Sequence, residues 1–319
     1  MARRLSKQQR RRIDRSQHAV DLNDPNHFHG LVISHRGGEI EVEPASGGNS
    51  LFCKLRSNLD AIVCGDRVVY QQQAQQQPSI IAILPRDNLL QRLDGFGNIK
   101  AVAANVSQML LCLSIEPAAN LFLLDQFLLS AEQQRVEALI VLNKIDLAGV
   151  ADVDPFHLKA IYQPLGYEVL PTSIHNAVNI DALQQHCIGK INVISGVSGV
   201  GKSSITQAIL PQIDIPIGAI SEVNREGRHT TRTSRLYHLP QGGDLIDTPG
   251  VRGFNPVLDP QQPIAAGFRD IATAAQYCRF SNCRHINEPD CAVLQAVQDQ
   301  TIYPSRYENY LKLLQDSEK

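Results

Sequence analysis

Tryptophan is absent from this 319-residue sequence, and aromatic residues make up only 5% of it. A single-strand nucleic-acid site built on stacked aromatic side chains is therefore not expected. No apolar run reaches the roughly 18 residues that span a bilayer, and the N-terminus has no apolar signal-peptide core. These absences predict a cytoplasmic protein with reduced thiols and no membrane partner.

Charge is nearly balanced overall, with a formal net charge of -2, but it is unevenly placed. Residues 1–28 form a basic, Gln-rich arm that is poor in apolar residues and is expected to be disordered when free. The arm either binds RNA phosphates or only keeps the terminus soluble. Its cationic residues near the start are Arg3, Arg4, Lys7, Arg10, Arg11, Arg12 and Arg15.

Three further regions differ in their pattern of apolar and turn residues, and together they predict a multidomain α/β protein. Short strand-like runs separated by turn residues over 29–87 predict a small β-barrel. Alternating strands and helices over 88–255 predict a largely parallel α/β sheet. Residues 256–319 favour helix and contain a Cys/His cluster, which predicts a helical metal-binding domain.

A phosphate-binding loop lies between a strand and a helix in "NVISGVSGVGKSSITQAI", residues 192–209. The backbone N–H groups of such a loop hold phosphate oxygens. Lys202 is expected to reach the β- and γ-phosphates, and the Ser203 hydroxyl is expected to bind Mg²⁺. The expected nucleotide contacts of the loop are Gly196, Val197, Ser198, Gly199, Val200, Gly201, Lys202, Ser203 and Ser204.

A second phosphate-side motif is "LIDTPG", residues 245–250. Asp247 ends an apolar strand, where its carboxylate can hold the metal through water. The N–H group of Gly250 can meet the γ-phosphate. The same four residues also make a good β-turn, so the motif gains weight from its position after the phosphate loop.

The identity of the nucleotide base is indicated by the segment "LIVLNKIDLA". It puts Asn143, Lys144, Ile145 and Asp146 at the end of a buried strand. The Asp146 carboxylate can accept hydrogen bonds from N1–H and the exocyclic amine of guanine, and adenine offers neither. Losing both would reject ATP by on the order of 10²–10⁴-fold. Ser173 and the backbone of Ile174 are a further expected base contact.

These motifs occur in an order that is rotated relative to ordinary GTPases, in which the phosphate loop comes first. A circular permutation keeps the same assembled site if the original termini lie close together. The arrangement resembles the circularly permuted GTPases, and most closely the ribosome small-subunit-dependent GTPase A family (RsgA, also called YjeQ). That resemblance covers nearly the whole chain.

The resemblance implies an OB-fold barrel, a central GTPase domain and a C-terminal zinc domain. It also implies GTP hydrolysis to GDP that is stimulated by the 30S ribosomal subunit and its 16S rRNA during late subunit maturation. The chain departs from the family at the base contact, which usually reads Ser-Ala and here reads Ser173-Ile174. A monomer is the default expectation.

The group that orients the attacking water is an open question in the sequence. Val251 follows Gly250, where many GTPases have a Gln, and Val cannot hydrogen-bond a water molecule. The first switch segment is expected in 224–237, where Thr231, or alternatively Thr230, would complete the Mg²⁺ shell. The resemblance suggests His229 as the catalytic group, and the alternative is a solvated face that touches RNA.

A metal site is indicated by "YCRFSNCRHINEPDC", whose spacing is Cys-x₄-Cys-x-His-x₅-Cys. Three thiolates and one imidazole suit a tetrahedral Zn²⁺ with no open position, which predicts a structural role. The expected ligands are Cys278, Cys283, His285 and Cys291.

Two other functions compete with that of an RNA-docked GTPase. A P-loop ATPase or small-molecule kinase is opposed by the Asn-Lys-Ile-Asp motif. A zinc-stapled RNA-binding module with a vestigial nucleotide site is opposed by the presence of Lys202, Ser203 and Asp247.

Overall fold

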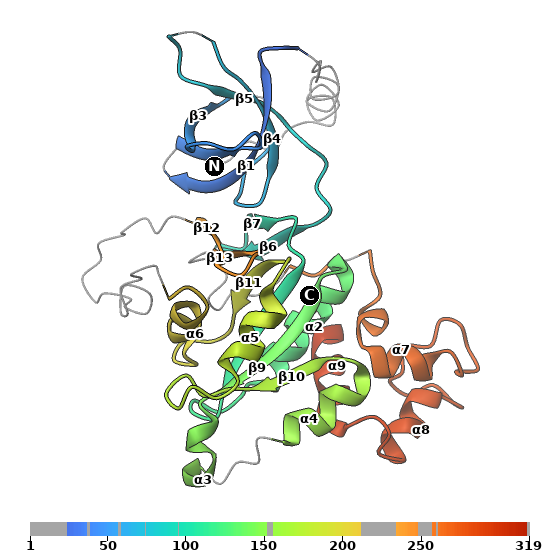
Figure 1. Cartoon of the computed structure of the whole chain (residues 1–319). Helices are drawn as coiled ribbons and strands as arrows, with labels where there is room; N and C mark the ends of the chain where they lie inside the picture. Colours follow the sequence, from blue (N-terminus) through green and yellow to red (C-terminus); the bar gives the residue numbers. More distant parts are fainter. Residues whose placement is uncertain are drawn as a thin grey trace.

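The structure is a computed structural model, and it describes most of the chain beyond the basic arm. The described residues are 24–36, 39–56, 59–73, 75–94, 96–151, 156–211, 234–247, 257–259 and 261–317. Figure 1 shows a barrel at one end, an α/β region in the middle and a group of helices beside it. We call residues 89–247 the α/β half and residues 257–317 the C-terminal region.

The first five strands close into a small barrel. They are β1 (His27–Arg36), β2 (Glu39–Pro44), β3 (Leu51–Leu55), β4 (Arg67–Gln71) and β5 (Ser79–Ile83). Hydrogen bonding runs around the ring in the order β1-β2-β3-β5-β4 and back to β1. Apolar side chains that alternate along the strands, among them Val32, Ile40 and Val68, fill the interior. The barrel is the five-stranded OB-type fold that the resemblance implied.

The strands of the α/β half continue the same sheet. They are β8 (Gln108–Ser114), β9 (Glu137–Asn143), β10 (Glu168–Pro171), β11 (Ile191–Ser195), β12 (Ser234–His238) and β13 (Asp244–Asp247). Their spatial order is β10-β9-β8-β11-β13-β12. All of them are parallel except β12, which runs antiparallel to β13. The strand before the phosphate loop, β11, therefore lies near the middle of the sheet although it comes late in the chain.

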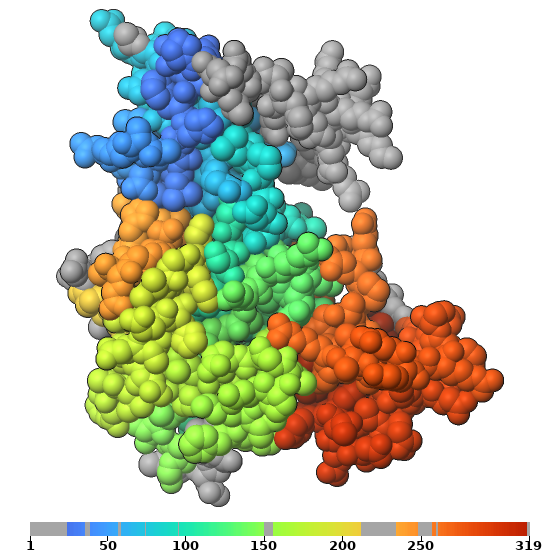
Figure 2. Space-filling model, turned by 45° about the vertical axis from the view of Figure 1, so that its right-hand side comes forward, coloured from blue at the N-terminus to red at the C-terminus, as the bar shows by residue number. Residues whose placement is uncertain are grey.

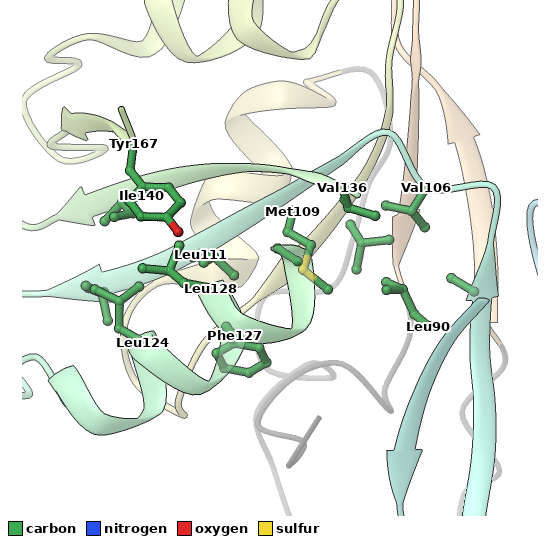
Figure 3. Packing of buried hydrophobic residues seen from close by; sticks show 14 of the residues in the cluster. Leu90, Val106, Met109, Leu111, Leu124, Phe127, Leu128, Val136, Ile140 and Tyr167 are labelled. Atoms are coloured by element: carbon green, nitrogen blue, oxygen red, sulfur yellow. The ribbon is translucent and has the colours of Figure 1, made fainter. Parts of the chain in front are cut away.

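Helices cover both faces of this sheet, which explains its continuous apolar strands. In the α/β half they are α2 (Leu121–Gln134), α3 (Ala148–Ala151), α4 (His157–Tyr162), α5 (Ile180–Cys187) and α6 (Lys202–Ile209), with short 3₁₀ turns η1 (Ile145–Leu147) and η2 (Gln163–Leu165). Met109 and Leu111 of β8 pack against α2 on one face, as Figure 3 shows for Phe127 and Leu128. The alternate residues Leu110 and Cys112 face α5 and α6.

The C-terminal region packs against the outer side of α2. Its helices are η3 (Ile264–Gly267), α7 (Arg269–Ala275), α8 (Ala292–Gln298) and α9 (Pro304–Ser317). Arg306 of α9 is buried and donates hydrogen bonds to Asp125 of α2 and Asp270 of α7. Burial lowers the pKa of Arg306, but these two carboxylates raise it above its ordinary value, so the guanidinium stays charged. This ion cluster joins the C-terminal region to the α/β half.

Two features of the fold were missed in the sequence. Strands β6 (Leu89–Leu93) and β7 (Ile99–Ala104) form a separate hairpin, and the sequence signal was the Gly-containing segment DGFGN at 94–98 between two strand-like runs. Residues 234–237, which we expected within the first switch segment, belong to strand β12. No helix in the ranges that the structure describes has the length and apolar composition needed to cross a membrane.

Candidate functional site

The phosphate loop follows β11 and ends at the first residue of α6, as the sequence predicted. Gly196 and Gly201 have φ values of 145° and 93°. A Cβ at Gly196 would lie 2.2 Å from the carbonyl oxygen of Cys112, and one at Gly201 would lie 2.4 Å from Nδ2 of Asn143. Glycine is therefore required at both positions by backbone conformation and by close packing.

Lys202 is buried at the start of α6 and turns back over the loop. Its Nζ donates hydrogen bonds to the carbonyl oxygens of Gly196 at 2.8 Å and Val197 at 2.6 Å. Burial raises the pKa of Cys112 beneath the loop to about 12, with Lys202 only partly opposing it, so this thiol is neutral. Ser203 and Ser204 are half-buried in the first turn of the same helix. The Lys202 cation and the N-terminal N–H groups of α6 thus lie together at the end of the phosphate loop, where a phosphate group can bind.

The Asn-Lys-Ile-Asp segment contacts the phosphate loop directly. Asn143 Nδ2 donates a 3.0 Å hydrogen bond to the carbonyl of Val200. Lys144 Nζ donates to the carbonyls of Gly199 at 2.6 Å and Glu116 at 2.7 Å. The first two residues of the motif therefore hold it against the phosphate loop, which lies more than 50 residues further along the chain.

Asp146 lies in η1, beside the loop that follows β10. The hydroxyl of Ser173 donates a 2.5 Å hydrogen bond to Oδ1 of Asp146. The Ser173 hydroxyl also accepts a hydrogen bond from the N–H of Asn176, and the side chain of Ser173 is fully buried. Ile174 is partly buried against the core on that side of the sheet. The carboxylate is thus oriented by Ser173, which the sequence analysis expected to make a further base contact of its own.

Asp247 is the last residue of β13 and lies opposite Arg235 in the pairing with β12. Because β8, β9, β10, β11 and β13 are parallel, the segments after them meet at one edge of the sheet. Three other expected site residues, His229, Thr231 and Gly250, lie outside the described residues, as does the alternative Thr230.

A second cluster lies in the C-terminal region, on the loops between α7 and α8. Ligand atoms of Cys278, Cys283, His285 and Cys291 all lie within 4.8 Å of one another. His285 Nδ1 is 3.5 Å from the sulfur atoms of both Cys278 and Cys291. Burial lowers the pKa of His285, which favours the neutral imidazole that binds metals. The four residues can hold one metal ion.

Hydrogen bonds to the surrounding loop hold the cluster in shape. Tyr307 and Tyr310 of α9 donate hydrogen bonds to the carbonyls of His285 and Arg284. Glu288 accepts from the N–H groups of Arg284 and Ile286. Burial raises the pKa of Glu288, but these backbone N–H groups outweigh it and lower the pKa to about 2. Two hydrogen bonds therefore tie the loop to α9, and the Glu288 carboxylate holds the loop together from within.

Comparisons with known proteins agree with this geometry. The family model described as RsgA GTPase matches residues 83–256. The chain belongs to the RsgA GTPase family. A relative from Hahella chejuensis, named small ribosomal subunit biogenesis GTPase RsgA, is 40% identical over 89% of this chain and 83% of its own. A relative of the same name from Saccharophagus degradans is 38% identical over 98% of this chain and 94% of its own.

Solved structures of RsgA relatives share the fold. YjeQ from Thermotoga maritima has a TM-score of 0.73 at 32% identity, covering 91% of this chain and 98% of that one. YloQ, described as a circularly permuted GTPase, has a TM-score of 0.71 at 26% identity, covering 94% and 98% of the two chains. In this RsgA-family chain the rotated motif order reflects a circular permutation of the GTPase fold, which leaves β11 near the middle of the sheet although it comes late in the chain.

Some contacts of the RsgA site were not foreseen. The carbonyl of Glu116 accepts from Lys144, and the Thr172 hydroxyl donates to Oδ1 of Asn143 at 3.4 Å. Glu116 belongs to no recognisable motif, because it contributes only its backbone. Thr172 opens the Thr-Ser-Ile segment after β10, but its contact with a side chain 29 positions away was not predicted.

Proposed function

We propose that this protein hydrolyses GTP to GDP and phosphate, with Mg²⁺, while docked on the small ribosomal subunit, and that it acts in the maturation of that subunit. The observation that carries the GTP assignment is the clamp between the Asn143–Asp146 segment and the phosphate loop. The clamp supports the proposal because it holds the segment that carries Asp146, the carboxylate proposed to bind guanine, at the same sheet edge as the phosphate loop. The names of the relatives support the ribosomal partner.

In this proposal the residues of the site have the following roles. Asp146, oriented by Ser173, accepts from the guanine edge, and Lys202 binds the β- and γ-phosphates. Bound Mg²⁺ neutralises charge on the phosphates. The residues proposed for guanine are Asn143, Lys144, Ile145, Asp146 and Ser173; those for phosphate are 196–204, Asp247 and Gly250; those for Mg²⁺ are Ser203 and Thr231.

We propose that several parts of the chain contribute to binding and acting on the small ribosomal subunit. Residues 1–28 would bind 16S rRNA phosphates, the barrel at 29–87 would dock on folded RNA, and 88–255 would carry out catalysis. Residues 256–319 would form the zinc domain. The low aromatic content favours shape-based docking over base stacking. We propose that the protein is a monomer and that it acts in the cytoplasm, where ribosomal subunits are assembled.

The Cys/His cluster is proposed to hold one structural Zn²⁺. Cys278, Cys283, His285 and Cys291 are all used as ligands, and four protein ligands leave no position for a substrate. The bound ion would favour the thiolate forms of the cysteines and would hold the loop between α7 and α8 in shape.

Turnover measured with and without small ribosomal subunits tests the proposed function. We expect slow intrinsic GTP hydrolysis and a rate that rises at least about tenfold on addition of small subunits, with large subunits as the control. GTP binding without any stimulation by small subunits would contradict the ribosomal part of the proposal.

His229 is proposed as the group that orients the attacking water. We expect His229→Ala to lower the stimulated rate at least about tenfold while GTP affinity is unchanged, since general-base or orienting groups contribute about 10²–10⁴-fold. Equal stimulated rates in the two proteins would remove His229 from the reaction.

A further inference from the structure

Strand β12 joins the barrel to the α/β half. It pairs with β13 on one side and with barrel strand β1 on the other, where Ser34 and His35 lie opposite Arg235 and Ser234. An edge strand exposes unpaired N–H and C=O groups that another strand can use. Here barrel strand β1 pairs with the edge of β12 that β13 leaves open. The views in Figures 1 and 2 both show the orange β12–β13 segment directly against the blue barrel.

Two ion pairs reinforce this joint, and both reach across to barrel strand β2. Arg235 Nη1 lies 3.4 Å from Oε2 of Glu41, and His238 Nε2 lies 2.9 Å from Oε2 of Glu43. His238 Nδ1 also lies 2.7 Å from Oδ1 of Asp244 on β13. The Ser50 hydroxyl donates to Glu41 and holds that carboxylate in place. Both ends of β12 are thus tied to the barrel by charged contacts.

The same strand leads to the nucleotide site. The backbone of Arg235 lies opposite Asp247 on β13 and opposite Ser34 on β1. Asp247, Arg235 and Ser34 therefore form one row across three hydrogen-bonded strands. The row is a continuous hydrogen-bonded path from the end of β13 to the barrel.

We propose that β12 couples the nucleotide bound at the phosphate loop to the attachment of the barrel to the α/β half. The Glu41–Arg235 and Glu43–His238 pairs are the contacts that hold the barrel on β12. This inference rests on the proposed function, since Asp247 must face the phosphates of GTP. Coupling between two equilibria is reciprocal. Loosening the barrel on β12 therefore changes the ratio of the affinities for GTP and GDP.

Hydrogen exchange on the full chain tests the coupling. Amide exchange in 34–36 and 39–43 is compared with saturating GDP and with a saturating non-hydrolysable GTP analogue. We expect different protection in the two states. We also expect the double variant Glu41→Gln/Glu43→Gln to reduce that difference and to change the ratio of GTP-analogue to GDP affinity by about fivefold or more.

Glu39→Gln is the matched control, because Glu39 lies on the same strand and pairs with β3 and the end of β1. We expect it to leave both the exchange difference and the affinity ratio unchanged. If both nucleotides bind and protection is identical, the inference is overturned while the proposed function stands. If neither nucleotide binds, both fall. If the double variant does not fold, the exchange comparison on the unaltered chain decides.

Discussion

At the scale of single residues, the proposed selectivity for guanine depends on how Asp146 is held. Ser173 donates to one carboxylate oxygen and fixes the orientation of the group. Two charge-assisted hydrogen bonds to guanine contribute about 1.5–3 kcal/mol each. We expect Asp146→Ala to weaken GTP binding at least about 100-fold, measured by calorimetry, with no gain in ATP affinity.

Glu168→Ala is the control for Asp146→Ala. Glu168 is exposed at the amino end of β10, the opposite end of the strand from Ser173. Its removal should leave GTP binding unchanged. Equal GTP affinity of Asp146→Ala and the unaltered chain would show that Asp146 does not contact the base.

Much of this residue-level chemistry was predictable from local sequence. The strand, the glycine loop and the following helix, residues 191–209, are adjacent in the chain, so their spacing dictates their geometry. The contacts of Lys144 with Glu116 and Gly199 were not predictable, because they depend on which strands are neighbours in the sheet.

At the scale of elements, Arg306 decides how α9 packs on α2 and α7. Its side chain is 2% exposed, and those of its partners Asp125 and Asp270 are 0% and 5% exposed. Removing the cation leaves two buried carboxylates without a counter-charge. We expect Arg306→Ala to lower the free energy of unfolding of the C-terminal region by about 3–5 kcal/mol, measured by chemical denaturation.

Lys100→Ala provides the contrast at the same scale. Lys100 is 58% exposed and lies 3.9 Å from Asp94. Exposed pairs of this kind contribute at most about 1 kcal/mol. A loss from Arg306→Ala that is no larger than the loss from Lys100→Ala would show that the buried cluster does not stabilise the helix packing.

At the scale of the whole molecule, we expect His238 to make the attachment of the barrel depend on pH. Burial lowers the pKa of His238, but Asp244 and Glu43 outweigh burial and raise it above the ordinary value of 6.5. A raised pKa in the folded state means that the contact stabilises the fold fully below that ordinary value. The contribution is lost as pH rises through the folded pKa.

The expected result is a difference in thermal midpoint between the unaltered chain and His238→Gln that shrinks as pH rises from about 6 to about 8.5. Because His238 is more than half exposed, the effect is a few tenths of a kcal/mol at most. A difference that does not vary with pH would show that the imidazole is not protonated in the joint.

The sequence by itself determined the local pieces: the phosphate loop, the Asn-Lys-Ile-Asp motif, the Cys/His spacing and the strands of the barrel. Each is defined by residues a few positions apart, whose backbone preferences and side-chain chemistry act over that range. Only the tertiary structure decided that β1 pairs with β12 and that Arg306 bridges α2 and α7. Those contacts join segments between about 35 and 200 residues apart, and their formation depends on the packing of the whole chain rather than on any local pattern.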